Sequence, residues 1–249
     1  MRVVALNIQH GGGRRTRAIA DALLAAEPDV VVLSEFHPSP AGCELLDLLY
    51  KAGLTEHAHG ERAATDYPNS VAVASRLPLT DARFPLPTTS ANRQRILEVG
   101  VGGLTLSAVY FPLGRPKVTF WRDEFLPYAA SRIEQPCLLV GDWNSGRHHL
   151  DEAGATLDGA AEFEAMTDTG WVDGWRSLHP DGREYTWYST HGNGFRLDHA
   201  FLSPSLAPRL LSSVYRHETR ASGVSDHSAL VVELAADGAD PAPGPVAGW

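Results

Sequence analysis

The sequence predicts an α/β (α+β) fold with mixed β-sheets, and two observations support this. First, short apolar runs typical of buried strands are interleaved with segments whose apolar residues recur at helical spacing. Second, the runs at 96–99 and 104–109 are separated only by the short turn 100–103, which indicates a hairpin. Because a hairpin joins antiparallel strands, we expect mixed sheets and not a purely parallel sheet.

The first part of the chain contains two predicted strands and two predicted helices. The run 3–7 is an apolar strand, and 30–33 lacks alternation, as expected for a strand with both faces covered. Residues 15–26 have the apolar spacing of a helix that Pro28 ends, and 44–51 form a second helix.

The rest of the chain continues both patterns. A long helix is predicted at 118–132, and a shorter one at 160–169 ends at Gly170. Further strands are predicted at 71–74, 96–99, 104–109, 137–140, 197–202 and 228–234.

Composition limits the classes of function. The chain has 249 residues, 43% of them hydrophobic, which is enough for a substantial core. A formal net charge of −9 argues against a protein that binds nucleic acid nonspecifically over its surface. It does not exclude a nuclease, because a metal ion would offset the negative charge of catalytic carboxylates. The basic clusters 14–17, 93–95 and 115–117 are either scattered surface charge or local phosphate sites.

Cysteine content and hydropathy point to the cytoplasm. The two cysteines give no disulfide framework. The chain opens with a core strand and shows neither the pattern of a signal peptide nor an apolar run as long as a membrane span. We therefore expect a cytoplasmic protein with no membrane partner.

Polar side chains stand where several predicted strands end. Asp142 and Asn144 directly follow the apolar run 137–140, and the Asp could hold or deprotonate a water. Alone, such residues are ordinary turn formers. Similar polar groups accompany four other strand-like runs, and together they favour one common site: Asn7, Glu35, Asp198 with His199, and Asp226 with His227.

From residue 7 to about 234, this pattern resembles the endonuclease/exonuclease/phosphatase superfamily. The segments 109–112, 171–176, 185–189 and 195–198 resemble its exonuclease III branch of abasic-site (AP) endonucleases. The resemblance implies a four-layer α-β-β-α sandwich of two facing mixed sheets with helices outside. Residues 1–235 would then be the catalytic domain, and 236–249 a flexible tail rich in Pro, Gly and Ala.

The implied chemistry needs a metal ion. Phosphodiester cleavage requires charge neutralisation on the phosphate, an activated water and donors for the nonbridging oxygens. Mg²⁺ suits this because it binds oxygen ligands beside one or two carboxylates, with Mn²⁺ as the expected substitute. The sequence has no Cys/His cluster at zinc spacing. The resemblance makes Glu35 the metal ligand, Asp226 a second metal-proximal acid, and Asn7 a residue that positions the metal shell or the phosphate.

The resemblance also assigns the catalytic roles. Asp142 would orient or deprotonate the attacking water, and Asn144 would bind a phosphate oxygen. His227 would donate to the phosphate as an imidazolium paired with Asp198, and the hydroxyl of Tyr110 would lie near the phosphate or leaving group. His199 is expected to be structural, because adjacent strand residues point to opposite faces.

Other residues are assigned to substrate binding. In the AP endonuclease branch, apolar side chains at Trp187, Phe195 and Leu197 line a pocket for a flipped, baseless sugar, and ordinary core packing is the alternative. Arg93 would approach the DNA backbone. Gln9 and Leu113 depart from the family pattern, and the segment 145–160 is shorter than in that branch.

These observations favour a monomeric, Mg²⁺-dependent DNA-repair phosphodiesterase. It would cut 5′ to abasic sites and trim 3′ ends, so its partner would be DNA with abasic sites or 3′ ends. One alternative is a phosphatase or other phosphodiesterase of the same superfamily that acts on a non-DNA phosphoester. Another is a catalytically inactive binding module, against which the full set of catalytic side chains argues.

Overall fold

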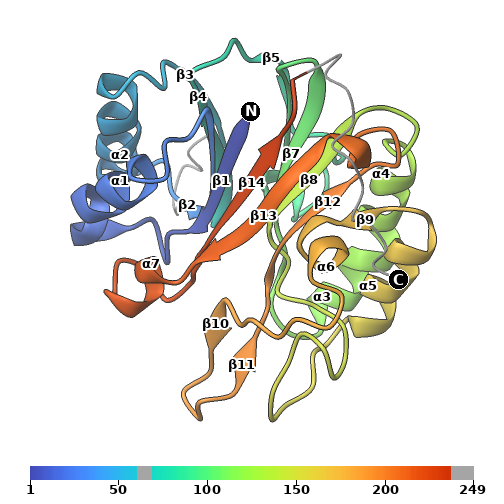
Figure 1. Cartoon of the computed structure of the whole chain (residues 1–249). Helices are drawn as coiled ribbons and strands as arrows, with labels where there is room; N and C mark the ends of the chain where they lie inside the picture. The colour runs from blue at the N-terminus through green and yellow to red at the C-terminus, as the bar shows by residue number, and fades with distance from the viewer. Residues whose placement is uncertain (61–68, 237–249) are drawn as a thin grey trace, which may run out of the picture.

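Two six-stranded sheets face each other in the computed structural model, which describes residues 1–60 and 69–236 (Figure 1). The first sheet has the order β13-β14-β1-β2-β4-β3. Its strands are β1 (Arg2–Asn7), β2 (Val30–Phe36), β3 (Glu56–His59), β4 (Ser70–Ser75), β13 (Leu210–Arg216) and β14 (Ala229–Leu234). Only β1 and β2 pair in parallel in this sheet, so it is mixed, as predicted.

The second sheet has the order β5-β6-β7-β8-β12-β9. Its strands are β5 (Thr80–Arg83), β6 (Ile96–Val101), β7 (Leu104–Tyr110), β8 (Cys137–Asp142), β9 (Val172–Asp173) and β12 (Asp198–Leu202). The predicted hairpin is β6–β7, and β7 and β8 pair in parallel. A separate ribbon of β10 (Trp187–Tyr188) and β11 (Gly194–Phe195) projects at the lower end of the molecule in Figure 1.

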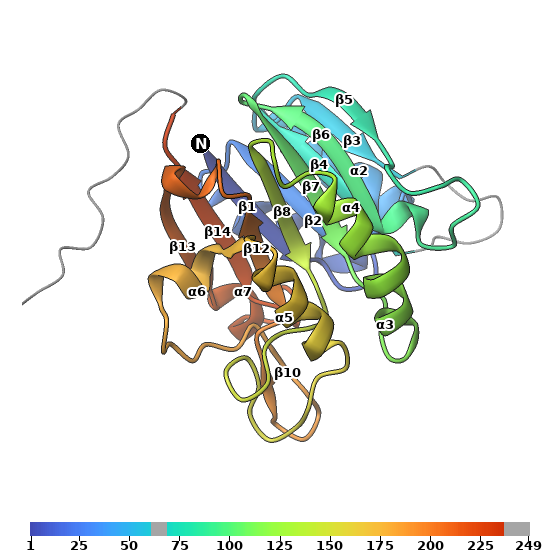
Figure 2. The same cartoon turned by 90° about the vertical axis from the view of Figure 1, so that its right-hand side faces the viewer.

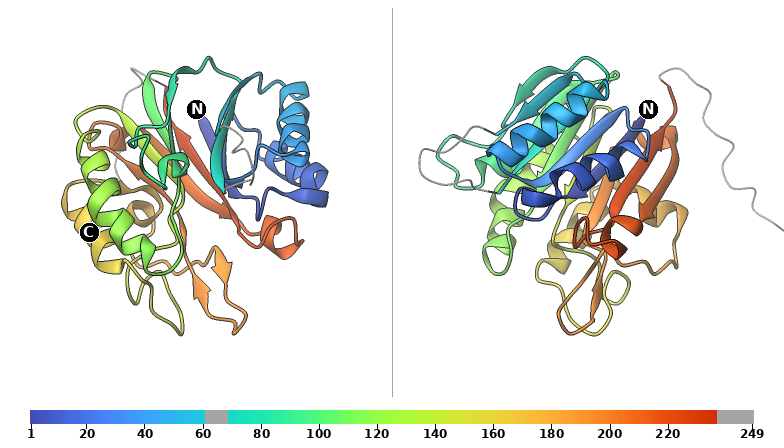
Figure 3. Two further views of the ribbon diagram at one scale, coloured as in Figure 1. Left: turned by 180° about the vertical axis from the view of Figure 1, so that it is seen from behind. Right: turned by 90° about the vertical axis from the view of Figure 1, so that its left-hand side faces the viewer.

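Helices cover the outer face of each sheet, as Figures 2 and 3 show from the two sides. The helices on the first sheet are α1 (Thr16–Leu24) and α2 (Pro40–Lys51). Those on the second are α3 (Pro116–Phe120), a π-helical turn (Trp121–Phe125), α4 (Leu126–Ala130) and α5 (Ala160–Asp168). Shorter helices are η1 (Gly13–Arg15), η2 (Arg93–Arg95), η4 (Ala207–Arg209), α6 (Gly174–Leu178) and α7 (Glu218–Ala221).

Three apolar clusters hold the four layers together. Alternation along β1 shows how: Val3 and Ala5 face the second sheet, whereas Val4 and Leu6 face the helices. A third cluster between the second sheet and α3–α5 is rich in aromatic rings, with Phe111 stacked on Trp143 at 5.1 Å between centroids. The four-layer α-β-β-α sandwich is therefore confirmed.

The short strands β3, β5 and β9 were not predicted, and two further differences have a clear physical reason. The single helix expected at 118–132 is divided by the π-helical turn. Pro127 follows this turn and has no N–H to donate to a carbonyl four residues earlier, so the ladder shifts there. The edge strand β13 was not predicted. Its apolar Leu211 and Val214 are exposed and serines lie between them, so the segment shows no regular apolar alternation.

Two further points concern the limits of the chain. The predicted tail, from residue 237 onward, lies outside the described residues. In the ranges that are described, no helix has the length and apolar character needed to cross a membrane.

Candidate active site

Strand register brings the polar strand ends together at one end of the sandwich. Asn7 pairs with Ser34 across β1 and β2, next to Glu35. In the second sheet, Asp142 pairs with Tyr110 on one side and with Asp198 on the other. The lower edge of the two sheets thus collects side chains that are far apart in the sequence.

The backbone at this edge has unusual conformations that direct the side chains of the candidate site. Gly141 has φ 146°, and a Cβ added there would lie 2.1 Å from the carbonyl oxygen of Val109. Only glycine fits this close approach, which explains why a glycine directly precedes Asp142. Glu35 and Asn144 adopt left-handed conformations, with φ 57° and 47°. Non-glycine residues held in this region cluster at functional sites.

Two serines hold the site together: Ser34 bonds across the two sheets, and Ser225 bonds to β1 within the first sheet. Ser34 on β2 donates its Oγ hydrogen to the carbonyl oxygen of Val109 at 3.2 Å and accepts from the Asp142 amide at 3.4 Å. Ser225 donates to the carbonyl oxygen of Asn7 at 2.5 Å. Because each bond crosses between elements, the position of Asp142 relative to Asn7 is fixed by both sheets.

Asn7 links the two central carboxylates. Its Nδ2 donates to Asp142 Oδ2 at 2.9 Å and to Glu35 Oε1 at 3.2 Å. Glu35 also accepts from the Tyr110 hydroxyl at 3.3 Å and from the His10 amide at 2.7 Å. The Asn7 side chain therefore acts here as a donor that sets the spacing of the carboxylates.

Asp142 is a buried acid with an altered affinity for protons. Burial, together with the charge of Asp198, raises the pKa of Asp142 to about 7, against the opposing charge of His227 and hydrogen bonds from Asn144 and Asn7. A carboxylate whose pKa lies near neutrality is suited to accept a proton in a reaction at that pH.

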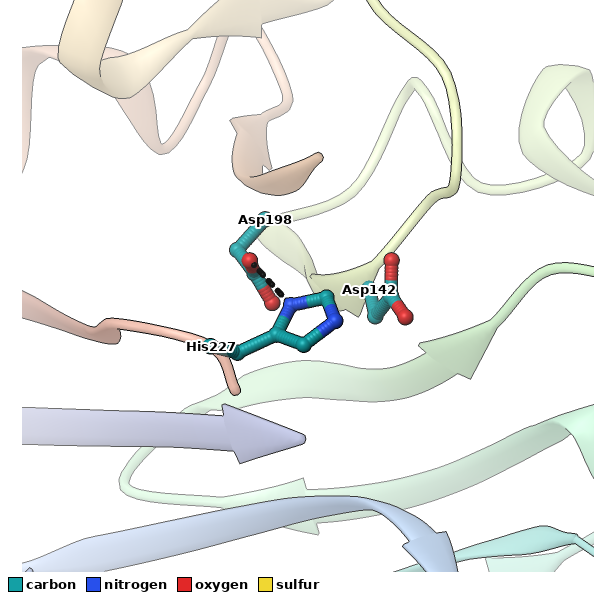
Figure 4. Close-up of side chains that lie close together, drawn as sticks. All are labelled: Asp142, Asp198 and His227. Atoms are coloured by element: carbon teal, nitrogen blue, oxygen red, sulfur yellow. Dashed lines mark hydrogen bonds and ion pairs between the residues drawn. The ribbon is translucent and has the colours of Figure 1, made fainter. Parts of the chain in front are cut away.

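His227 and Asp198 form a buried pair (Figure 4). Asp198 Oδ2 lies 2.9 Å from His227 Nδ1, and the other ring nitrogen faces the side of Asp142. Burial acts to lower the pKa of His227, but the charge and hydrogen bond of Asp198, with the charges of Asp142 and Asp226, raise it to about 10. The ring is therefore held as an imidazolium that can donate a proton or a hydrogen bond.

Several acids at this end could hold a metal ion. Ligand atoms of Asp142, Asp198 and His227 lie within 4.8 Å of one another. Asp226, beside His227, accepts from Trp187 Nε1 at 3.1 Å through Oδ2, whereas its buried Oδ1 has no hydrogen-bond partner. A buried carboxylate oxygen without a donor is costly unless a cation or water satisfies it.

The Tyr110 hydroxyl is placed as a neutral donor. It donates to Glu35 and accepts from Asn69 Nδ2 at 3.2 Å. Burial, with the nearby charges of Glu35 and Asp142, raises the pKa of Tyr110 above its usual range. The phenol therefore keeps its proton at neutral pH.

These groups surround a cavity of about 410 Å³. One wall carries the aromatic and aliphatic side chains of Trp187, Phe195 and Leu197, and Leu113 stands at the rim with 67% of its surface exposed. Of the twelve residues predicted for the site, nine line this cavity: Glu35, Tyr110, Asp142, Asn144, Trp187, Phe195, Leu197, Asp226 and His227. Asn7 and Asp198 contact the lining residues from behind. Arg93 does not line this cavity and lies in a neighbouring one.

The apolar wall is anchored from behind by a buried charge network. Arg196, between Phe195 and Leu197, is fully buried and bonds to Asp151 at 2.7 Å and to Asp173 at 2.6 Å. Burial acts to raise the pKa of Asp173, but the charge of Arg196 and contacts with His199 hold it far below its usual range.

His199 belongs to the structural part of the site. Its Nε2 lies 2.8 Å from the carbonyl oxygen of Ser145 and 3.0 Å from that of Arg196, and its Nδ1 faces Asp173 at 3.6 Å. The buried ring therefore faces the charge network and not the cavity, in agreement with the structural role expected for it.

Several residues around the cavity were not predicted as site residues, and three residues that were missed contribute to the geometry of the site. Ser34 and Asn69 join the site through contacts between segments that are far apart in the sequence, for which the sequence carries no local signal. Lys117 had been noted only as part of a basic cluster, yet it is buried, lines the cavity and donates to the carbonyl oxygen of Asn144. Burial lowers the pKa of Lys117, and the charges of Asp158 and Asp142 oppose this.

The fold and the site define a hydrolase of the phosphoesterase type, with acids, an imidazolium and a phenol at the open end of a β-sandwich. The chain belongs to the endonuclease/exonuclease/phosphatase family, whose family model matches residues 4–227. A DNA repair nuclease, APEX1 of Danio rerio, is 29% identical over 132 residues. The match covers 46% of this chain and 42% of that relative, so the chain spans less than half of its length.

Solved structures share the fold of this chain, among them an AP endonuclease and an exonuclease. An AP endonuclease from Archaeoglobus fulgidus superposes with a TM-score of 0.82 at 19% identity, over 94% of this chain and 99% of that one. A 3′-5′ exonuclease, NExo, from Neisseria meningitidis has a TM-score of 0.75 at 25% identity, over 94% of this chain and 100% of that one.

Proposed function

We propose that this protein is a Mg²⁺-dependent DNA-repair phosphodiesterase that cuts 5′ to abasic sites and trims blocked 3′ ends. The observation that carries the proposal is the apolar wall of Trp187, Phe195 and Leu197, which shares one cavity with Asp142 and His227. A small apolar surface beside phosphoester chemistry suits a sugar that has lost its base. The relatives named above, a DNA repair nuclease and an AP endonuclease, support the same substrate class.

The residues present fit a bound Mg²⁺. Glu35 and Asp226 both line the cavity, and the buried Asp226 Oδ1 lacks a hydrogen-bond partner. Hard oxygen ligands of this kind are those that Mg²⁺ prefers. We assign Glu35 and Asp226 as the residues that would hold the ion, with Asn7 setting the position of Glu35. When bound, the ion would supply positive charge to the phosphate oxygens.

The other residues act on the water and on the phosphate. Asp142 takes a proton from the attacking water, because Asn7 holds its carboxylate in place and burial raises its pKa. His227, as an imidazolium, and Tyr110, as a neutral phenol, donate to the phosphate and leaving oxygens.

Asn144 has a different part from the one first expected. Its Nδ2 donates to the carbonyl oxygen of Phe111 at 2.9 Å and to Asp142 Oδ2 at 3.3 Å. These two contacts occupy the amide hydrogens that would otherwise bind a phosphate oxygen. We therefore assign Asn144 to the positioning of Asp142.

The proposal is tested with a labelled duplex that contains one abasic-site analogue. We expect incision immediately 5′ to the analogue with Mg²⁺, restoration by Mn²⁺, and loss of incision with a chelator. Glu35→Gln should require more metal for half-maximal activity, while Glu44→Gln, an exposed acid on α2, should behave as wild type.

A second panel separates the alternative within the family. It contains duplexes with a 3′-phosphate, phosphorylated metabolites and lipid phosphodiesters. Turnover of these non-DNA phosphoesters by folded protein, without incision of abasic DNA, would contradict the DNA-repair proposal and support a small-phosphoester hydrolase.

A further inference from the structure

A second cavity adjoins the active site and carries two arginines. It has a volume of about 550 Å³. The residues that line it, named here the arginine pocket, are Asn69, Thr88, Ser90, Ala91, Arg93, Gln94 and Arg95. Asn69 lines both cavities and bonds to the Tyr110 hydroxyl, so the two spaces share a wall.

Three buried polar atoms of the arginine pocket have no hydrogen-bond partner among the described residues. Arg93 Nε, Gln94 Oε1 and Arg95 Nη1 are buried atoms with no hydrogen bond. Over the ranges 1–60 and 69–236, neither guanidinium forms an ion pair with a carboxylate. Buried donors normally find a partner, so unsatisfied donors of two neighbouring arginines point to a ligand that accepts hydrogen bonds.

Aromatic rings hold the two arginines in place. The guanidinium carbon of Arg95 lies 4.9 Å from the centroid of the Tyr110 ring, and that of Arg93 lies 5.4 Å from the centroid of Phe84. Stacking restricts each guanidinium without using its N–H groups. The charge in the arginine pocket is therefore positioned in advance and is available to an anion.

The negative charge of the whole protein bears on what the arginine pocket binds. The formal net charge is −9, and the catalytic cavity contains Glu35, Asp142, Asp158 and Asp226. Such a surface repels a nucleic-acid backbone unless local cations offset it. Two arginines that form no ion pair with a described carboxylate lie beside the acidic cavity and supply that offset where the strand enters or leaves.

We propose that the arginine pocket binds the backbone phosphate next to the scissile one, on the same DNA strand. This inference rests on the proposed function, because it takes a phosphodiester strand as the substrate. With the scissile phosphate on one side of the Tyr110 ring, the neighbouring phosphate reaches Arg95 and Arg93 on the other. The arginine pocket thus selects a polynucleotide over an isolated phosphoester and fixes the register of the strand.

The test uses methylphosphonate, a neutral replacement for one backbone phosphate. A set of duplexes with the same abasic analogue carries one methylphosphonate each, at successive positions on both sides. Wild type, Arg93→Gln/Arg95→Gln, Arg93→Lys/Arg95→Lys and Lys51→Gln are compared by KM and kcat at several salt concentrations. Lys51→Gln is the control, because it removes a positive charge at the exposed end of the 12-residue helix α2.

The proposal predicts one sensitive position. In wild type, a methylphosphonate there should raise KM about tenfold with kcat nearly unchanged, the loss expected from one charge-assisted contact. The double Gln variant should show the same raised KM with the normal duplex and no further loss with the modified one. In the double Gln variant, the slope of log affinity against log salt concentration should fall by roughly one for each lost contact between an arginine and a phosphate. The double Lys variant should recover part of the lost slope.

Two results overturn the proposal. One is a double Gln variant that remains as sensitive as wild type to every methylphosphonate position. The other is a KM of the double Gln variant equal to that of Lys51→Gln.

Binding of the same duplexes, measured by fluorescence anisotropy in the presence of chelator, separates this inference from the proposed function. Arginine-dependent binding without incision would contradict only the proposed activity. Incision with arginine-independent binding would contradict only the arginine pocket.

Discussion

Gly141→Ala tests whether the close approach of β7 and β8 sets the geometry of the site. The added Cβ would lie 2.1 Å from the carbonyl oxygen of Val109, whereas real contacts of this kind are essentially never under 3.0 Å. The two strands must therefore separate locally by about 0.9 Å, which stretches a hydrogen bond of ordinary length beyond its useful range.

The expected loss of stability follows from two contributions. Losing one or two ladder hydrogen bonds beside Gly141 costs about 1 kcal/mol each. Placing an L-residue at φ 146° adds roughly 1–3 kcal/mol of backbone strain. The sum of about 2–5 kcal/mol is large for the addition of a single methyl group.

Urea unfolding followed by tryptophan fluorescence measures this loss. The matched control is Gly223→Ala, where φ is also positive, at 73°, but no atom lies within 4 Å of the added Cβ. That control should lose only about 1–2 kcal/mol. Equal midpoints for the two variants would refute the steric argument, and an unchanged m-value would confirm that both variants unfold from a compact native state.

Three further predictions follow from the site. Asp142→Asn should lower kcat at least about a hundredfold, the usual share of a general base, with little change in unfolding midpoint; turnover within threefold of wild type would contradict its role. Phe195→Ala should weaken the preference for abasic sites more than it weakens 3′ trimming, and equal losses of both activities, measured on the two substrates, would indicate packing alone. The pKa of Asp173 is depressed in the folded protein, so its ion pair with Arg196 stabilises the fold above the unfolded pKa of about 4 and is progressively lost as pH falls below it. Asp173→Asn should therefore be less stable at pH 7 and show a shallower loss of stability in acid, as measured by urea midpoints between about pH 2 and 7; parallel pH curves for the two proteins would contradict the assignment.

The sequence predicted the site well where a residue follows its own strand. Asp142 and Glu35 stand directly after apolar runs, and the ends of neighbouring strands meet at one edge. The pairing of His227 with Asp198 came from the family resemblance, and the structure shows it at 2.9 Å.

Features that depend on packing between distant segments were less accessible. Ser34 joins two sheets, and Arg93 lies beyond Tyr110 in a separate cavity. Neither placement follows from local spacing. The π-helical turn before Pro127 likewise reflects a missing donor inside an otherwise regular helical pattern. The hydrogen bonds of Asn144 are another case, because its role depends on where the carbonyl of Phe111 lies.

Arg196 holds the apolar wall of the cavity in place without lining the cavity itself. Its neighbours Phe195 and Leu197 meet the cavity, while its own side chain is held by two buried carboxylates on the opposite side. The shape presented to the substrate and the force that holds the segment therefore reside in different residues. Substitutions at 195 and 197 therefore change the wall of the cavity without breaking the ion pairs, whereas a neutral residue at 196 leaves the two buried carboxylates of Asp151 and Asp173 without their cation.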